Sequence, residues 1–138
     1  MSDHETVHTT FTLERVYPAP PAAVFAAWAD RRTKARWMAG SADADLELDF
    51  RVGGVEVARG RAEGGPALTF TSHFHDVVDD ERIVYSSTMH AEGRGITTVS
   101  VTSVELEPAT GEQGGGTRLV LTQQGTATQL DALGVVLA

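Results

Sequence analysis

The chain has 138 residues, of which 19 are acidic and 11 basic, so its net charge at neutral pH is -8. This length suits a single domain over 1–138, and the acidity and scattered positive charges argue against a nucleic-acid partner. The absence of cysteine excludes disulfides and thiolate sites. A polar start and a longest apolar run at 22–29 predict a cytoplasmic protein with no membrane partner.

The N-terminal part predicts one strand followed by two short helices. Residues 9–17 mix β-branched and aromatic side chains, as strands do. Two prolines then open "AAVFAAWAD", in which Val24, Phe25 and Trp28 share one helical face. The next segment, "RRTKARWMAG", has helical character and ends at Gly40, a residue suited to close a helix.

From residue 45 the apolar period changes to two, which is typical of strands. A two-residue hairpin turn is expected at Gly53-Gly54, and a weaker signal of the same kind occurs at Asp79-Asp80. A longer loop, "PATGEQGGG", separates the last two strands. The six strands predicted in this part are 45–52, 55–61, 67–78, 81–90, 96–107 and 117–124.

Two further features complete the predicted architecture. After Val101 the apolar residues change from odd to even positions, which predicts a β-bulge near Thr102 or Ser103. Leucines at near-helical spacing predict a short helix over 126–138. The order of elements indicates an α+β fold with an antiparallel sheet packed on one helix.

The Asp79-Asp80 turn sets the faces of one strand pair. In its register Ser72 lies opposite Ser87, between two apolar pairs on the same face. That face is the candidate wall of a ligand cavity, and its apolar members are Phe70, Phe74, Tyr85 and Met89.

The opposite face carries "SHFHD", whose histidines raise the question of a metal site. His73 and His75 lie about 6 to 7 Å apart at Cα on one strand. His90 lies opposite Thr69, roughly 13 Å from His73, and Asp76 points to the other face. Because catalytic zinc generally takes three protein ligands, we predict exposed histidines and no metal site.

The Gly53-Gly54 turn places Arg59 on an apolar face beside Phe50 and Val57, and it pairs Arg51 with Glu56 as an exposed ion pair. A charged side chain on an apolar face must be paired, reach water, or bind an anion. Arg59 is therefore either a residue of the sheet rim or an anion anchor in a cavity.

The motifs resemble a known superfamily. "RVYPAPPAAVFAAWADRRTKARWM" resembles the N-terminal strand and helix pair of the START-like, Bet v allergen-like proteins, often called SRPBCC. "DFRVGGVEVARGR" followed by "FHDVVDDERIVYSSTMH" is similar to the branch named for the activator of the heat-shock protein ATPase. The resemblance covers about residues 10–125. It implies a helix-grip fold, in which a curved antiparallel sheet wraps around a C-terminal helix and encloses an apolar cavity.

Members of this superfamily bind lipids, hormones or polyketides, a few are cyclases, and the namesake stimulates a chaperone. The resemblance implies no universal catalytic residue, and we expect no cofactor. In the family the terminal helix is longer than 126–138 and opens with a Gly-Trp pair that this chain lacks. A short helix would leave part of the inner face open, which predicts a homodimer.

The leading hypothesis is a non-catalytic protein that binds a small apolar ligand, which carries an anionic group if Arg59 is an anchor. One alternative is a cyclase-like or hydrolase-like enzyme, with Tyr85 and Arg59 as its titratable groups. Another is a module that interacts with a chaperone. Trp37 either packs in the core or forms a lid over the pocket. The predicted ligand-binding residues are Trp37, Phe50, Val57, Arg59, Phe70, Phe74, Tyr85 and Met89.

Overall fold

The computed structural model of the chain describes residues 7–61, 64–109 and 115–127. Its elements, in chain order, are β1 (Val7–Tyr17), α1 (Pro21–Ala29), α2 (Arg31–Ala39), β2 (Leu46–Leu48), β3 (Val55–Arg61), β4 (Ala67–Val78), β5 (Arg82–Ala91), β6 (Gly95–Pro108) and β7 (Thr117–Ala127).

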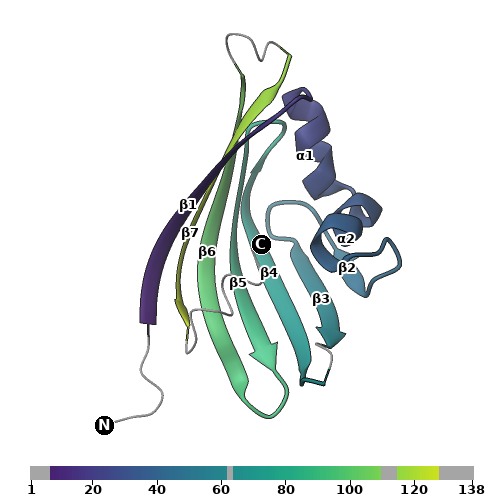
Figure 1. Cartoon of the computed structure of the whole chain (residues 1–138), viewed down its shortest axis with the longest axis vertical. Helices are drawn as coiled ribbons and strands as arrows, with labels where there is room; N and C mark the ends of the chain where they lie inside the picture. The colour runs from purple at the N-terminus through teal and green to yellow at the C-terminus, as the bar shows by residue number, and fades with distance from the viewer. Residues whose placement is uncertain (1–6, 62–63, 110–114, 128–138) are drawn as a thin grey trace.

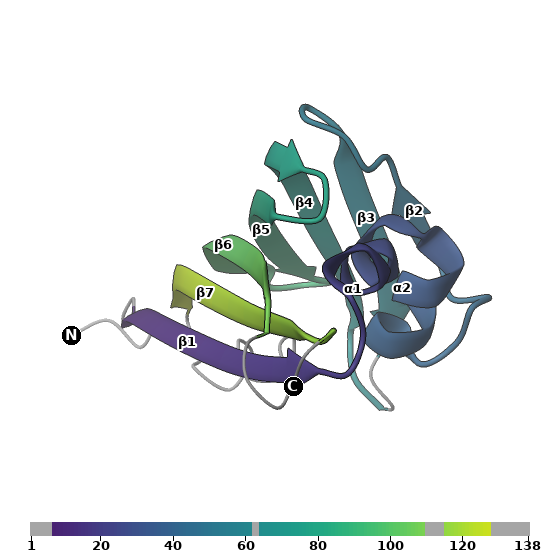
Figure 2. The same ribbon diagram turned by 90° about the horizontal axis from the view of Figure 1, so that it is seen from above.

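Within these ranges the strands form one seven-stranded antiparallel sheet, in the order β1-β7-β6-β5-β4-β3-β2. The sheet curves, and α1 and α2 lie on its concave side (Figures 1 and 2). This arrangement confirms the predicted α+β class and the helix-grip sheet. The helix predicted over 126–138 is wrong at its start, because Thr126 and Ala127 continue β7. Its remainder lies outside the described residues, so the homodimer that it suggested stays a prediction.

The two helices have the ends that the sequence indicates. Pro21 occupies the first turn of α1, where a missing N–H costs no hydrogen bond. The side chain of Asp30 caps α2 by accepting a hydrogen bond from the Thr33 N–H at 3.0 Å, and Gly40 ends α2 in the left-handed conformation. None of the helices in the described ranges is both long enough and apolar enough to cross a membrane.

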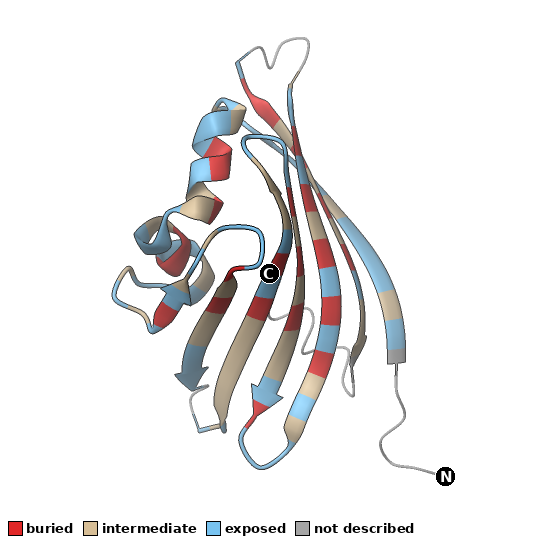
Figure 3. Cartoon of the chain, turned by 180° about the vertical axis from the view of Figure 1, so that it is seen from behind, coloured by how far each residue is buried: buried red, intermediate tan, exposed pale blue. Residues whose placement is uncertain are grey.

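The core lies between α1 and the concave face of the central strands. Ile83 and Val104 are completely buried there, and Phe74 is nearly so. Burial alternates along β5 and β6 and in the middle of β4 (Figure 3), because successive side chains of a strand point to opposite faces of the sheet. The core cluster comprises Val24, Phe25, Trp28, Phe74, Ile83, Tyr85, Val104, Leu106, Leu119 and Leu121.

The predicted register between β4 and β5 is confirmed over most of its length, with Phe74 opposite Tyr85. The connecting turn holds three residues rather than two, since Val78 pairs with Arg82. A β-bulge at His75 adds one residue to β4 and compensates for the longer turn. The two deviations cancel, so the predicted pairs from Thr69 to Phe74 remain correct.

The predicted register between β2 and β3 is wrong. Residues 49–54 form a loop in place of the two-residue turn, and Leu48 pairs with Glu56. The pairing is displaced by three residues from the prediction, and an odd displacement exchanges the two faces of a strand. Glu56 therefore points inward, whereas Val57 and Arg59 point to the convex face.

The predicted bulge near Thr102 or Ser103 is also wrong. The pairing of β6 with β7 runs without interruption from Thr98 to Pro108. Along β6 the inward residues change from polar to apolar, and this change imitates a slip in the apolar pattern. Val99 and Val101 are half-exposed on the convex face, while the buried inward residues are Thr98, Ser100, Thr102, Val104 and Leu106.

Candidate ligand-binding cavity

A cavity of about 820 Å³ lies between the concave face of the sheet and the two helices. This volume falls within the range of roughly 300 to 1,000 Å³ that small-molecule sites occupy. Apolar side chains from both layers supply most of its wall. The lining residues are Phe11, Leu13, Arg15, Tyr17, Pro18, Ala19, Ala23, Val24, Ala27, Trp28, Lys34, Trp37, Met38, Glu56, Phe70, Tyr85, Leu119, Leu121 and Gln123.

The exposure of the lining residues distinguishes an open side from an inner end. Phe11, Tyr17 and Trp37 are between 37% and 48% exposed and mark the open side. Lys34 and Glu56 are 2% and 1% exposed, and they mark the inner end. A molecule that enters past the aromatic residues would therefore reach two charged groups.

Those two charged groups form a buried ion pair. The Lys34 Nζ atom, from α2, lies 2.6 Å from the Glu56 Oε2 atom, from β3. The contact does not have hydrogen-bond geometry at Oε2, so mutual charge is its main component. Removing two charges from water is costly, and each is tolerated here because the other compensates for it.

Three aromatic rings surround the ammonium group of Lys34. Its Nζ atom lies 5.4 Å from the ring centroid of Trp28, 5.5 Å from that of Phe74 and 6.0 Å from that of Tyr85. Ring faces attract cations, so the rings supply part of the stabilisation that water would otherwise give. They also hold Lys34 in a fixed position against the sheet.

Burial shifts the acid–base equilibria of this end of the cavity. It lowers the pKa of Lys34 below its ordinary value of 10.5, although the negative charge of Glu56 acts in the opposite direction. Burial also raises the pKa of the Tyr85 hydroxyl, and Glu56 reinforces that shift. Tyr85 therefore keeps its proton at neutral pH.

A row of buried polar side chains crosses the sheet beside the ion pair. Ser72, which is the neighbour of Glu56 across β3 and β4, shares a 2.8 Å hydrogen bond with Ser87. In the adjoining row the Thr102 hydroxyl donates to Gln123 Oε1 at 3.1 Å, and Gln123 lines the cavity. The concave face of the sheet thus has a polar part beside its apolar part.

The structure brings together some of the predicted ligand-binding residues. Trp37, Phe70 and Tyr85 line the cavity. Phe74 lies behind the lining, in edge contact with Phe50, whose ring centroid is 5.1 Å away. Trp37, Tyr85, Phe74 and Phe50 belong to one series of ring contacts, which passes through Trp28 of α1.

Other predicted residues lie elsewhere. Met89 faces inward opposite Phe70 but is not part of the cavity lining. Val57 and Arg59 are on the convex face, so the expectation that they line the cavity is wrong. The Arg59 guanidinium is 48% exposed and pairs with Glu47 at 2.8 Å and Asp45 at 3.3 Å. The predicted pair of Arg51 with Glu56 is wrong too, because Arg51 pairs with Asp49.

The histidines of "SHFHD" are exposed, as the sequence indicates. His75 occupies the bulge and contacts the Ser86 hydroxyl through Nε2 at 2.7 Å. In the part of the chain that the structure describes, no group of three His, Cys, Asp or Glu side chains is placed to hold a metal ion.

Sequence reasoning missed Lys34 and Glu56. Two signals were available. The first is that Lys34 is the only lysine among the 11 basic residues. The other signal is the parity of β3, in which an inward Glu56 sends both Arg59 and Arg61 to solvent. One buried acid with one buried partner is less costly than two arginines on an apolar face.

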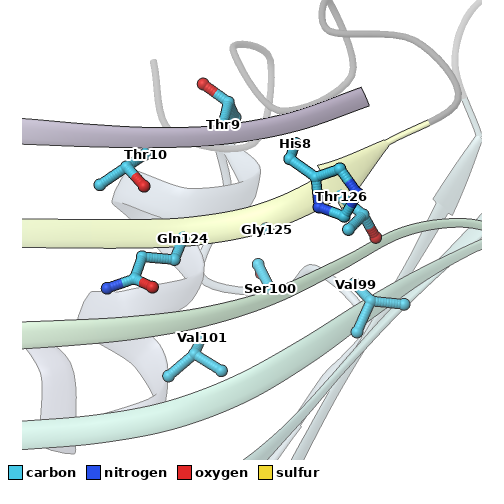
Figure 4. A pocket seen from close by; sticks show the side chains of 9 residues that line it. All are labelled: His8, Thr9, Thr10, Val99, Ser100, Val101, Gln124, Gly125 and Thr126. Atoms are coloured by element: carbon cyan, nitrogen blue, oxygen red, sulfur yellow. The ribbon is translucent and has the colours of Figure 1, made fainter. Parts of the chain in front are cut away.

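A second hollow, of about 450 Å³, lies over β1, β7 and β6. Figure 4 shows its lining, which is mostly small and polar: His8, Thr9, Thr10, Val99, Ser100, Val101, Gln124, Gly125 and Thr126. Val99 and Val101 are half-exposed and belong to the convex face. The hollow has no buried charged group and shares no residue with the larger cavity.

A curved antiparallel sheet with two short helices on its concave side defines a START-like protein. Within this class, the chain belongs to the family of activator of Hsp90 ATPase homolog 1-like proteins, whose model matches residues 18–136. No protein with a curated description matches the chain.

Solved structures show the same relationship. Protein Mll3558 from Rhizobium loti is 43% identical, with a TM-score of 0.82 over 95% of this chain and 89% of its own. A protein from Rhizobium leguminosarum is 29% identical, with a TM-score of 0.80 over 96% of this chain and 91% of its own. PFC0360w, an HSP90 activator from Plasmodium falciparum, is 23% identical, with a TM-score of 0.59 over 83% and 71% of the two chains. The last likeness shows a shared fold.

Proposed function

We propose that the protein is a non-catalytic binding protein for a small apolar ligand, which occupies the cavity on the concave side of the sheet. The observation that carries this proposal is the size of the cavity together with its lining by apolar side chains from β1, β7 and α1. Such a wall favours an apolar molecule without selecting one compound.

The cavity offers poor groups for acid–base catalysis. Tyr85 stays protonated because burial raises its pKa, and Arg59 is on the other face of the sheet. Lys34 and Glu56 neutralise each other at 2.6 Å, so neither is a free acid or base beside a bound molecule. These features favour binding over a cyclase-like or hydrolase-like reaction.

Binding of an apolar dye to the cavity tests the proposal. Nile red, an uncharged apolar dye, is expected to bind the purified protein, and native mass spectrometry is expected to show a copurifying small molecule. Replacing Leu13, a half-buried lining residue, with Trp fills part of the cavity. This change is expected to weaken Nile red binding about tenfold, a loss of roughly 1.4 kcal/mol.

Val16 provides the matched control, because it lies on the same strand and is 49% exposed on the other face. Val16→Trp is expected to leave Nile red affinity unchanged. Equal affinity of the two variants and the unmodified chain would place the dye outside the cavity and remove the support for the proposal.

The description of the family favours a second candidate, a module that stimulates the ATPase of a heat-shock chaperone. A direct assay separates the two functions. The ATPase rate of the chaperone Hsp90 is measured with and without a molar excess of this protein. Saturable stimulation that Leu13→Trp leaves intact would favour the chaperone module, whereas an unchanged rate together with dye binding favours the ligand-binding protein.

A further inference from the structure

The ammonium group of Lys34 has hydrogen-bonding capacity that the protein does not use. An ammonium carries three N–H donors. In the described part of the chain, Glu56 is the only polar partner of Nζ, and the other neighbours are the rings of Trp28, Phe74 and Tyr85. Lys34 is one of the residues that line the cavity, so its side chain lies beside the space that a bound molecule would occupy.

The charge of the inner end restricts which acceptor fits. Lys34 and Glu56 together carry no net charge, and both are almost completely buried. A carboxylate beside them would add a second negative charge next to Glu56, at a cost of several kcal/mol in such a place. Arg15, the other charged residue of the lining, is exposed and so does not belong to this buried end. A neutral oxygen acceptor adds a hydrogen bond without adding a charge.

We propose that the cavity selects uncharged, mainly apolar molecules that carry a carbonyl oxygen, and that Lys34 donates a hydrogen bond to this oxygen. This inference rests on the proposed ligand-binding function and names the chemical class of its ligand. Glu56 acts as the positioning residue, because it holds the ammonium against the sheet while leaving donors toward the cavity.

The balance of effects at Lys34 agrees with this assignment. Burial disfavours the ammonium form more than Glu56 favours it, so the charged amine lacks part of the solvation it has in water. A carbonyl dipole aimed at Nζ would replace some of this lost solvation. The apolar lining from Leu13, Leu119 and Leu121 would contact the rest of the molecule.

Three naphthalenes with the same ring position substituted provide the test. Acetylnaphthalene carries the carbonyl, isopropenylnaphthalene has nearly the same shape without an acceptor, and naphthoate carries a negative charge. Their affinities are measured by displacement of Nile red from the unmodified chain. The acetyl compound is expected to bind at least about tenfold more tightly than the other two, because a hydrogen bond to a charged donor contributes that much affinity.

The variant that isolates the ion pair is Lys34→Met with Glu56→Met, which removes both charges and keeps unbranched side chains of similar volume. In this double variant the preference for the acetyl compound is expected to disappear, while the affinity for the isopropenyl compound changes less than about threefold. The matched control, Arg59→Met with Glu47→Met, removes an exposed ion pair and is expected to leave all three affinities unchanged.

Each other outcome is decisive. Equal affinities for the three compounds would overturn the inference and leave the ligand-binding function in place. Tightest binding of naphthoate would overturn the choice of an uncharged ligand. Persistence of the acetyl preference in the double variant would show that Lys34 is not the donor. Failure of Nile red and of all three compounds to bind would contradict the proposed function itself.

Discussion

Lys34 and Glu56 are brought within 2.6 Å of each other from different layers of the fold, α2 and β3. The pair joins a helix to the concave face of the sheet at the inner end of the cavity. It is buried among aromatic rings, so its energetic behaviour should differ from that of the ion pairs on the surface of the same protein.

We predict that Lys34→Met alone lowers the free energy of unfolding by about 3 to 5 kcal/mol at neutral pH, because it leaves the Glu56 carboxylate buried without a partner. The double variant Lys34→Met with Glu56→Met should recover most of this loss, since it removes both charges. Urea unfolding followed by circular dichroism measures both values.

The exposed pair of Arg59 and Glu47 supplies the comparison for this experiment. Arg59→Met should change the urea midpoint far less than Lys34→Met does, because water and salt screen charges on the surface. If Lys34→Met were as stable as Arg59→Met, Glu56 would have to be solvated or protonated in the folded protein.

The single lysine makes its own titration directly measurable. We predict that Lys34 loses its proton below pH 10.5 in the folded state, because burial lowers its pKa. Nuclear magnetic resonance of protein with isotope-labelled lysine reports this titration from a single side-chain signal. A midpoint at or above 10.5 would contradict the burial of Nζ.

The same shift has a consequence for stability. Between the lowered pKa and 10.5 the unfolded chain binds more protons at Lys34 than the folded chain does, so the free energy of unfolding should rise with pH in that window. The variant with both Lys34→Met and Glu56→Met lacks this contribution, and the difference between the two unfolding curves isolates it. A difference that is independent of pH would contradict the linkage.

Gly125 permits a close approach between β7 and β6. A Cβ atom at this position would lie 2.6 Å from the Val99 carbonyl oxygen and 3.0 Å from the Ser100 Cβ atom. We predict that Gly125→Ala destabilises the protein by about 1 to 3 kcal/mol, because the backbone must shift to make room. Thermal unfolding measured by calorimetry gives the value.

Gly60 is the control for that prediction, because a Cβ atom there would meet nothing within 4 Å. Gly60→Ala should be neutral or stabilising by up to about 1 kcal/mol, since Ala restricts the unfolded chain more than Gly does. Equal destabilisation by both substitutions would indicate a general intolerance of β3 and β7 rather than a specific contact.

Periodicity and turn signals were sufficient for most of the fold. They predicted the first strand, both helices and the order of six further strands, because each has a clear apolar pattern. The predicted register between β4 and β5 is also correct, but only because the bulge at His75 compensates for a turn that is one residue longer than predicted.

The candidate site was less predictable, because its key contact is between residues far apart in the chain. Alternation along β3 permits either face to point inward, and the choice depends on Lys34 supplying a partner for Glu56. A local turn signal at Gly53-Gly54 outweighed that pairing in the prediction, and Arg59 was assigned to the wrong face. Trp37, Phe70 and Tyr85 were found because their positions did not depend on that turn.

Trp37 lies at the open side of the cavity. Its ring is 48% exposed and meets the ring of Trp28 edge-on, with centroids 4.9 Å apart. Its indole N–H donates to the Ala27 carbonyl at 2.8 Å. The ring is thus fixed to α1 beside the path into the cavity.

We predict that a bound ligand covers the exposed part of Trp37. The chain has two tryptophans, so Trp28→Phe leaves Trp37 as the only one and Trp37→Phe leaves Trp28. Nile red or acetylnaphthalene should change the emission of Trp37 strongly, because a half-exposed indole loses contact with water when a ligand covers it. Trp28 is only 9% exposed without ligand, so its solvation and its emission should change less. Energy transfer to the ligand would quench both, so the emission maximum is compared rather than the intensity. A blue shift of Trp37 alone supports a lid at the cavity opening, and an unchanged maximum with bound ligand would mean that the molecule enters elsewhere.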